Sequence, residues 1–377
     1  MKKIILFSLI FSLLFLTSCM PQNTEIKYRL VIEGIGIDYD NENNLYELTV
    51  QVLETSEGNP EQGKSDAPVI NYYVKGKTVA EAINSLGENT GKYPLYSQNR
   101  LILIGSSVTG DRLIKALNFF VREYTSRPDV FVAAASGKAS DILTVDTSGE
   151  VPAKLIEDEI RQCNENSVAV GTELYNAVNL SLEETTCFTL PLAEVTKDRI
   201  PEEKTVKITG ARVCSDDIRD LSANETMSYL FISDKVKSGA FSLKTDEYDA
   251  ALEIIRSKTK TKLTLQEGKP VFQYIVSCEV DVVEFAGDSF SSFTESDIDE
   301  IEKIAADYIK SGMDNLFDRF VKEEKCDIFR LGTRLARKYP DIYKTLKADW
   351  ENSVSSISCV TDVSVKVGRI GQMTVRE

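Results

Sequence analysis

The N-terminal segment constrains this chain more than any later motif, because it predicts the compartment in which the chain folds. Two lysines start it, an apolar run follows over Ile4–Leu16, and Thr17-Ser18-Cys19 places small residues before a cysteine. This order is typical of a bacterial secretory signal with a lipobox, at which the thiol is acylated and the chain is cut before it. A transmembrane anchor, the alternative, needs about 20 apolar residues, and this run is shorter. We therefore expect a signal peptide over residues 1–18 and a lipid on Cys19.

We expect the acyl groups to hold the protein at the outer face of a membrane, through a short polar tether over residues 19–25. The polypeptide contributes little attraction of its own, since 44 basic and 59 acidic side chains give a formal net charge of −15. Such a charge repels both nucleic acid and anionic headgroups. We therefore expect no nucleic-acid partner, and a membrane contact made through the lipid.

The sequence contains no histidine. This excludes Ser-His-Asp and Cys-His nucleophile systems and His-ligated zinc, and we expect neither a catalytic centre nor a cofactor. No CxxC pair is present, which argues against a structural metal site. The remaining cysteines could form disulfides in an exported chain, in many connectivities between which the sequence cannot choose, or could be buried as small apolar residues. They are Cys163, Cys187, Cys214, Cys278, Cys326 and Cys359.

The hydrophobic pattern predicts an α+β fold. Segments 28–37 and 45–54 are rich in β-branched and aromatic residues, and the polar stretch between them predicts a β-hairpin with a turn of Asp and Asn. Further along, short apolar strands alternate with amphipathic helices. We expect strands at 69–74, 100–106 and 130–135, and helices at 78–86, 111–124 and 139–143.

The length allows several domains. The best linker candidate is 199–204, which contains Pro201 and charged residues. We expect an N-terminal α/β-type domain over 26–200, a small β-rich middle domain over 205–265 and a C-terminal α+β domain over 270–377.

The C-terminal domain is expected to be an antiparallel sheet packed with a long helix. Ser296 can cap a helix that starts at Asp297, and apolar residues then recur at three- and four-residue steps as far as Val321. Shorter helices are predicted over 331–338 and 342–350, and a last strand over 359–367.

The segment GIGID at Gly34–Asp38 is superficially similar to a phosphate-binding loop. A polar turn and a second strand follow it instead of a helix, so its glycines are better explained by close strand packing or a bulge. Asp38, Asp40 and Glu42 at alternate positions are similar to the start of a calcium loop. The sixth position, which requires glycine, is Asn43. A hairpin turn is the better interpretation of these acids.

Taken in order, the motifs of the chain resemble the Ger(x)C lipoproteins, the C subunits of spore germinant receptors, over about residues 26–372. In the block at 209–222 the family tends to have an aromatic residue where Cys214 stands and a glycine where Asp220 stands. The motifs are GIGID (34–38), YELTVQ (46–51), GKTVAEAI (76–83), NRLILIG (99–105), VREYTSRPDVFVAAASGKASDIL (121–143), TGARVCSDDIRDLS (209–222), CDIFRLGTRLARKYPDIYKTLKADW (326–350) and VSVKVGRIG (363–371).

The resemblance implies a three-domain α+β protein without a catalytic centre. It also implies a complex with a polytopic A subunit and a transporter-like B subunit in the inner membrane of the spore, which senses small nutrients and starts germination. The alternative function is a solute-binding lipoprotein of a transport system. Such proteins have two similar α/β lobes around a cleft, and the predicted elements do not form two matching lobes.

A basic stripe is predicted on the helix at 331–338, where Arg330, Arg334, Arg337 and Lys338 recur on one side. It could dock an acidic partner or lipid headgroups. The simpler interpretation, which we favour, is a solvated face opposite an apolar one.

Overall fold

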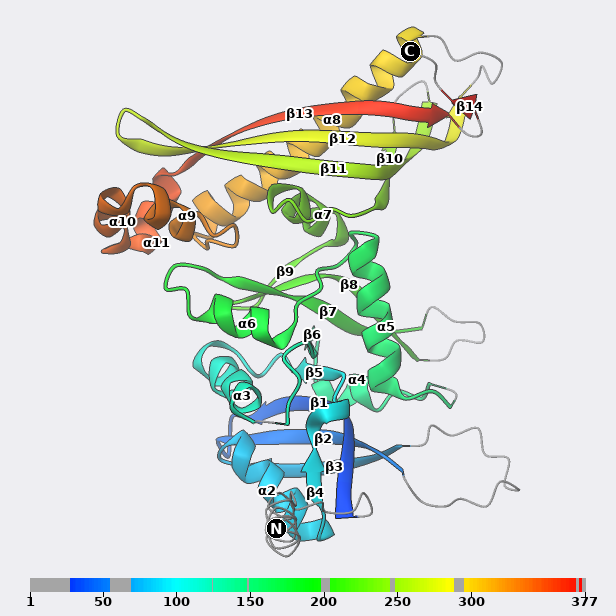
Figure 1. Cartoon of the computed structure of the whole chain (residues 1–377), viewed down its shortest axis with the longest axis vertical. Helices are drawn as coiled ribbons and strands as arrows, with labels where there is room; N and C mark the ends of the chain where they lie inside the picture. The colour runs from blue at the N-terminus through cyan, green and yellow to red at the C-terminus, as the bar shows by residue number, and fades with distance from the viewer. Residues whose placement is uncertain are drawn as a thin grey trace, which may run out of the picture.

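The computed structural model describes residues 28–54, 69–123, 125–147, 149–197, 204–244, 248–287, 295–370 and 373–374. Cys19, the predicted signal peptide and the tether lie outside the described residues, as does most of the expected linker. The described chain forms two β-sheets, one towards each end of an elongated molecule, with helices packed on both (Figure 1). The predicted α+β class is confirmed.

The first sheet has the order β3-β2-β1-β5-β6-β7-β8-β9, with β4 paired to β1. β1 and β2 form the predicted antiparallel hairpin, and β5, β6 and β7 continue in parallel from β1. Parallel neighbours need crossover connections, which the intervening helices supply. The strands are β1 (Arg29–Asp40), β2 (Leu45–Leu53), β3 (Val69–Gly76), β4 (Tyr93–Leu95), β5 (Leu101–Ile104), β6 (Phe131–Ala135), β7 (Phe188–Thr196), β8 (Thr205–Cys214) and β9 (Arg219–Leu221).

Helices cover both faces of this sheet (Figure 1). The core on one face, under α2, α3 and α6, includes Ile102, and the core on the other, under α4 and α5, includes Leu103. These neighbours on β5 are both fully buried because successive side chains of a strand point to opposite faces. The helices are α2 (Val79–Thr90), the 3-10 turn η2 (Tyr96–Gln98), α3 (Gly110–Arg122), α4 (Ala139–Leu143), α5 (Pro152–Glu165) and α6 (Leu174–Ser181).

The second sheet has the order β10-β11-β12-β13-β14. Its main core lies under α7, α8 and α9 on one face. On β10 the side chains alternate between buried and exposed positions, as expected for a sheet with one solvated face. The strands are β10 (Gly239–Lys244), β11 (Tyr248–Gln266), β12 (Lys269–Gly287), β13 (Ser358–Ile370) and β14 (Met373–Thr374).

The predicted long helix is confirmed as α8, which continues directly into a π-helical turn, η3. The helix predicted over 331–338 is confirmed as α9, and the next predicted helix is divided into two. The elements are α7 (Ala223–Ile232), α8 (Glu295–Phe317), η3 (Asp318–Glu323), α9 (Leu331–Lys338), α10 (Pro340–Lys347), α11 (Trp350–Ser353) and the 3-10 turn η4 (Val354–Ser356).

One detail of the expected C-terminal sheet needs correction. β10, β11 and β12 are antiparallel neighbours, as predicted, but β12 and β13 run parallel. The helices α8 to α11 lie between them in sequence and form the crossover that a parallel pair requires. The sheet is therefore mixed.

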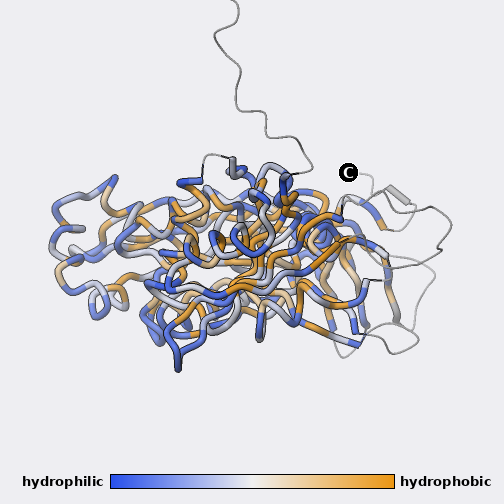
Figure 2. The backbone as a smooth tube through the Cα atoms, turned by 90° about the horizontal axis from the view of Figure 1, so that it is seen from below, coloured by the Kyte–Doolittle hydropathy of each residue, from blue (hydrophilic) through white to orange (hydrophobic). Residues whose placement is uncertain are grey.

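The residues expected to form a separate middle domain, 205–265, are divided between the two sheets. β8 and β9 complete the first sheet, whereas β10 and β11 begin the second. The expected boundary before residue 270 falls in the β11–β12 hairpin. Figure 2 shows the hydrophobic segments gathered along the middle of the molecule, with hydrophilic segments around them.

Candidate functional site

The GIGID segment has a structural role where β1 meets two helices. A Cβ on Gly36 would lie 3.2 Å from the Cβ of Ala139, and one on Gly34 would lie closer still to α5. These glycines therefore allow α4 and α5 to approach the strand, as the packing interpretation predicts. Asp38 then accepts hydrogen bonds from the backbone N–H groups of Ala139 (2.9 Å) and Ser140 (3.0 Å), which caps α4. Burial raises the pKa of Asp38 and these hydrogen bonds lower it, with a net increase.

The acids at the β1–β2 turn do not converge on a common point. Asp40 accepts hydrogen bonds from the backbone N–H groups of Glu42 (2.9 Å) and Asn43 (3.1 Å), which confirms the hairpin-turn interpretation. Asp38 is directed to α4 instead. Within the described ranges, no group of three or more Cys, Asp or Glu side chains is arranged to hold a metal ion.

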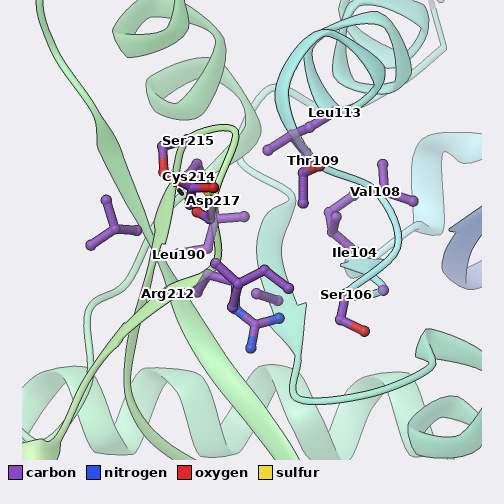
Figure 3. A pocket seen from close by; sticks show the side chains of 14 residues that line it. Ile104, Ser106, Val108, Thr109, Leu113, Leu190, Arg212, Cys214, Ser215 and Asp217 are labelled. Atoms are coloured by element: carbon purple, nitrogen blue, oxygen red, sulfur yellow. Dashed lines mark hydrogen bonds between the residues drawn. The ribbon is translucent and has the colours of Figure 1, made fainter. Parts of the chain in front are cut away.

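A small pocket lies at the carboxyl ends of β5 and β6, the edge at which α/β sheets commonly bind ligands. Figure 3 shows the side chains that line it, including Ile104, Leu190 and Arg212. The Arg212 guanidinium donates hydrogen bonds to the Ala135 carbonyl (2.6 Å) and to the Asp220 carboxylate (2.8 and 2.9 Å). The remaining volume is about 20 Å³, which holds little more than one water molecule. This edge of the sheet is filled by the protein itself.

The N-terminal and C-terminal parts of the chain meet at a contact that we call the seam. The seam consists of the segment 183–187 before β7 and the segment 326–333 at the start of α9. The Cys187 N–H donates a hydrogen bond to the Asp327 carbonyl at 2.9 Å. The Thr333 hydroxyl donates to Glu183 at 2.7 Å. These contacts join residues more than a hundred positions apart, so the seam fixes the N-terminal part of the chain against the C-terminal part.

Asp327 organises the C-terminal side of the seam. Its carboxylate accepts hydrogen bonds from the backbone N–H groups of Phe329 (3.1 Å), Leu331 (2.9 Å) and Gly332 (2.9 Å). It therefore caps α9 from a position that is only 1% exposed. Burial raises its pKa to about 6, against the lowering effect of the three hydrogen bonds.

Glu183 supplies the charge on the N-terminal side. Arg330 forms a two-pronged ion pair with it, in which the Nε to Oε2 distance is 3.0 Å. Burial tends to raise the pKa of Glu183, but the hydrogen bonds from Arg330, Thr333 and Thr186 lower it overall. The seam thus holds one buried carboxyl with a raised pKa and one partly exposed carboxylate with a lowered pKa.

A cavity of about 490 Å³ lies beside the seam. It is mostly polar and draws its walls from both parts of the chain: Asn176, Asn179 and Thr189 belong to the N-terminal side, and Ser233, Lys235 and Arg334 come from later elements. This volume matches small-molecule sites. Its amides, hydroxyls and cations could hydrogen-bond a small polar molecule.

The residues of the predicted basic stripe have different surroundings. Arg330 is held by Glu183, and both Arg330 and Arg334 line the cavity. Arg337 is exposed. Lys338 donates a hydrogen bond to the Leu263 carbonyl of β11 at 2.6 Å. The opposite side of α9 is buried through Leu331 and Leu335, so the helix has one apolar side and one polar side.

Sequence reasoning did not single out Glu183 or Asp327, and it named Cys187 and Cys326 only among the six cysteines that could form disulfides or be buried. A signal for Asp327 was present, because an Asp shortly before a predicted helix is a common cap. Glu183 carried no such signal, since its partner Arg330 is remote in sequence.

Two family models match the chain in succession. The first, described as the spore germination protein N-terminal domain, matches residues 22–195. The second, described as spore germination B3/GerAC-like, C-terminal, matches residues 210–371. Between them they cover most of both sheets.

Curated relatives and a solved structure agree with these matches. Spore germination protein B3 of Bacillus subtilis (strain 168) is 25% identical over 372 residues, with 96% of each chain covered. Spore germination protein A3 of the same organism is 27% identical over 350 residues, with 91% of each covered. The crystal structure of the GerBC protein superposes with a TM-score of 0.58 at 22% identity, over 89% of this chain and 96% of that one.

Proposed function

Because the chain belongs to the Ger(x)C family of spore germination proteins, we propose that it is the non-enzymatic, lipid-anchored C subunit of a spore germinant receptor. It would assemble with a polytopic A subunit and a transporter-like B subunit and would be needed for receptor assembly or signalling. The observation that carries this proposal is the succession of two germination-protein matches over nearly the whole chain.

The proposed anchor is a lipid on Cys19, at the outer face of the spore's inner membrane. The sequence before it has the order of a lipoprotein signal. In the part of the chain that the structure describes, no helix is long and apolar enough to cross a membrane. A lipid anchor would keep such a chain beside polytopic partners.

The competing function, solute capture for a transporter, has less support. A solute-binding protein would show two similar lobes around its cleft. Among the residues that the structure describes, one sheet has nine strands and helices on both faces, whereas the other has five strands in a different order. The relatives that match both parts of this chain are named as spore germination proteins.

The exposed end of the basic stripe is the proposed docking surface. Arg337 is exposed at the end of α9, beside Lys338, which donates a hydrogen bond to Leu263 of β11. These two residues place positive charge on a protein whose net charge is −15. An acidic segment of a partner subunit would be attracted to this surface.

The decisive experiment is a pull-down of the tagged full chain from gently solubilised spore membranes. We expect two polytopic proteins to be recovered with the wild type, and a strong loss with Cys19→Ala. Cys163→Ser is the matched control, because it removes a thiol elsewhere and leaves the anchor intact. Recovery of the chain alone, or together with an ATP-driven transporter, would contradict the receptor proposal.

The docking surface has its own test in the same assay. The double variant Arg337→Glu/Lys338→Glu should reduce recovery of the partners, because reversed charges repel an acidic segment. Lys303→Glu, an exposed lysine on α8, is the matched control and should recover them normally. Equal recovery with both variants would remove this surface from the proposal.

A further inference from the structure

The seam brings together two cysteines that are far apart in sequence. Cys187 directly precedes β7, and Cys326 follows η3. The backbone N–H of Cys187 donates to the carbonyl of Asp327, the neighbour of Cys326, at 2.9 Å. The two thiols interact, which lowers the pKa of Cys187 and raises that of Cys326. The two side chains therefore face each other across the contact between the N-terminal and C-terminal parts.

The other cysteines have different surroundings. The Cys163 thiol donates to the Ile208 carbonyl, and Cys278 lies on the core face of β12. Cys214 comes nearest as a competitor, because it lies on β8 directly opposite Phe188. Cys214 and Cys187 also line one small pocket. Cys187, however, is held beside Cys326 by the backbone hydrogen bond to Asp327, so Cys326 is the partner that the backbone favours.

The two thiols differ in access. Cys187 is partly exposed and lines the cavity of about 490 Å³, so a small molecule can reach it. Cys326 is only 5% exposed. The interaction with Cys326 lowers the pKa of Cys187, which increases its thiolate fraction, and the thiolate is the reactive form. Cys187 is thus the first thiol that an oxidant would meet.

We propose that Cys187 and Cys326 are a disulfide-forming pair, which covalently joins the two sheets when the chain meets an oxidising disulfide. The biological occasion for this reaction depends on the proposed export of the chain, since disulfides persist mainly outside the cytoplasm. The structure thereby favours one pair of cysteines, whereas the sequence left many pairings open.

The chemistry is thiol–disulfide exchange in two steps. The Cys187 thiolate attacks one sulfur of a small disulfide, forms a mixed disulfide and expels one thiolate. Cys326 then loses its proton and attacks the Cys187 sulfur, which expels the second small thiol. Overall, two protein thiols lose two electrons and two protons, and one small disulfide is reduced to two thiols.

The bond would close a loop from residue 187 to residue 326, which contains β7 to η3. Cross-linking a long loop restricts the unfolded chain and stabilises the fold. It would also hold the seam closed beside the Glu183–Arg330 ion pair, so that the two sheets could not separate there. The reduced protein keeps only the non-covalent contacts.

The test is peptide mapping of the purified full chain after treatment with oxidised glutathione. We expect one linked peptide that contains Cys187 and Cys326, absent after reduction, and a higher melting temperature for the oxidised protein. Cys326→Ser should instead leave Cys187 as a mixed disulfide with glutathione. Cys278→Ser, the matched control, should retain the linked peptide.

The wild-type chain decides the matter even if a variant folds poorly. A bond between Cys187 and Cys214, or two thiols that stay unlinked in the folded wild type, would overturn the proposal. The assay contains no partner subunit. A negative result therefore leaves the receptor proposal standing, and a failed pull-down would leave the disulfide result standing.

Discussion

The two sheets of this protein are built on different plans. Both faces of the first sheet are covered, and adjacent residues on β5 belong to two separate cores. The second sheet has its large core on one face, while alternate residues on β10 and β11 are exposed. The first sheet is thus covered on both faces, whereas the second has one face exposed to solvent, where a partner could bind.

The hydrophobic patterns of the strand sequences reflect this difference. β5 is the continuous apolar run Leu101–Ile104, as a strand buried on both faces must be. β11 includes Arg256-Ser257-Lys258-Thr259-Lys260-Thr261-Lys262, in which polar and charged residues occupy the exposed positions. It also extends beyond β10, which pairs with it only as far as Ile254. Lysines on such an edge discourage pairing with another chain.

The largest expected effect tests this contrast directly. Ile102→Ala and Leu103→Ala should each lower the free energy of unfolding by about 2–5 kcal/mol, because both neighbours are fully buried. On β11, Leu252→Ala should cost a similar amount, but its neighbour Glu253→Ala should change stability by less than about 0.5 kcal/mol. Urea unfolding of the four variants measures the differences.

Two results would contradict this difference between the two sheets. A small loss for either Ile102→Ala or Leu103→Ala would mean that one face of the first sheet contributes little. A loss for Glu253→Ala comparable to that for Leu252→Ala would mean that the exposed face of the second sheet is energetically important.

The next effect concerns Asp327, the buried cap at the seam. Its pKa in the folded protein, about 6, is above the ordinary value of 3.8. Between these values the folded state binds more protons than the unfolded state, so stability falls as pH rises through this window. Relative to Asp327→Asn, the wild type should lose about 2 kcal/mol between pH 4 and pH 6, the larger part of the total expected from a shift of about two pKa units. Urea unfolding of both proteins across this range measures the difference.

Asp327→Asn is a suitable reference because its amide oxygen can keep the hydrogen bonds from Phe329 and Leu331, while it does not titrate. The other carboxyl groups titrate alike in both proteins, so their contributions cancel in the difference between the two free energies of unfolding. A difference that stayed constant, or that favoured the wild type as pH rose, would contradict the raised pKa of Asp327.

Local features of the fold could be predicted from the sequence, and long-range features could not. The first hairpin, α4 and α9 follow from turn residues, periodicity and helix length, which are properties of short segments. Val121 shows the limit of periodicity: it follows the fully buried Phe120 in the apolar pattern of α3, yet it is 47% exposed. Whether a face of a helix is buried depends on which other elements cover it, and the hydrophobic pattern of the helix does not show where those elements lie.

The seam and the division of residues 205–265 depend on pairings between distant segments. Nothing in β8 alone indicates that it pairs with β7, and nothing in Glu183 indicates Arg330. The predicted basic stripe illustrates the consequence. Its spacing on α9 is as expected, but Arg330 forms an ion pair and Lys338 binds a backbone carbonyl. The sequence predicted where the charges are and not what they contact.

A smaller effect is expected from the ion pair at the seam. Arg330→Ala or Glu183→Ala should lower stability by about 1 kcal/mol, since the pair is two-pronged but partly exposed. A double-mutant cycle isolates the coupling between the two side chains. High salt should weaken it, because exposed charges are screened. Independent, additive losses would show that the pair does not hold the two parts together.

The smallest effect is expected on the exposed strand. Lys260→Ser/Lys262→Ser should change the free energy of unfolding by less than about 0.5 kcal/mol, because exposed side chains without buried contacts contribute little. Serine removes two of the positive charges from this edge of β11, so self-association should increase, which sedimentation velocity measures. Lys303→Ser on α8 is the matched control and should leave self-association unchanged. A large loss of stability with the double variant would show that these lysines support the fold, and the exposed face of the second sheet would then be as important for stability as the covered faces of the first.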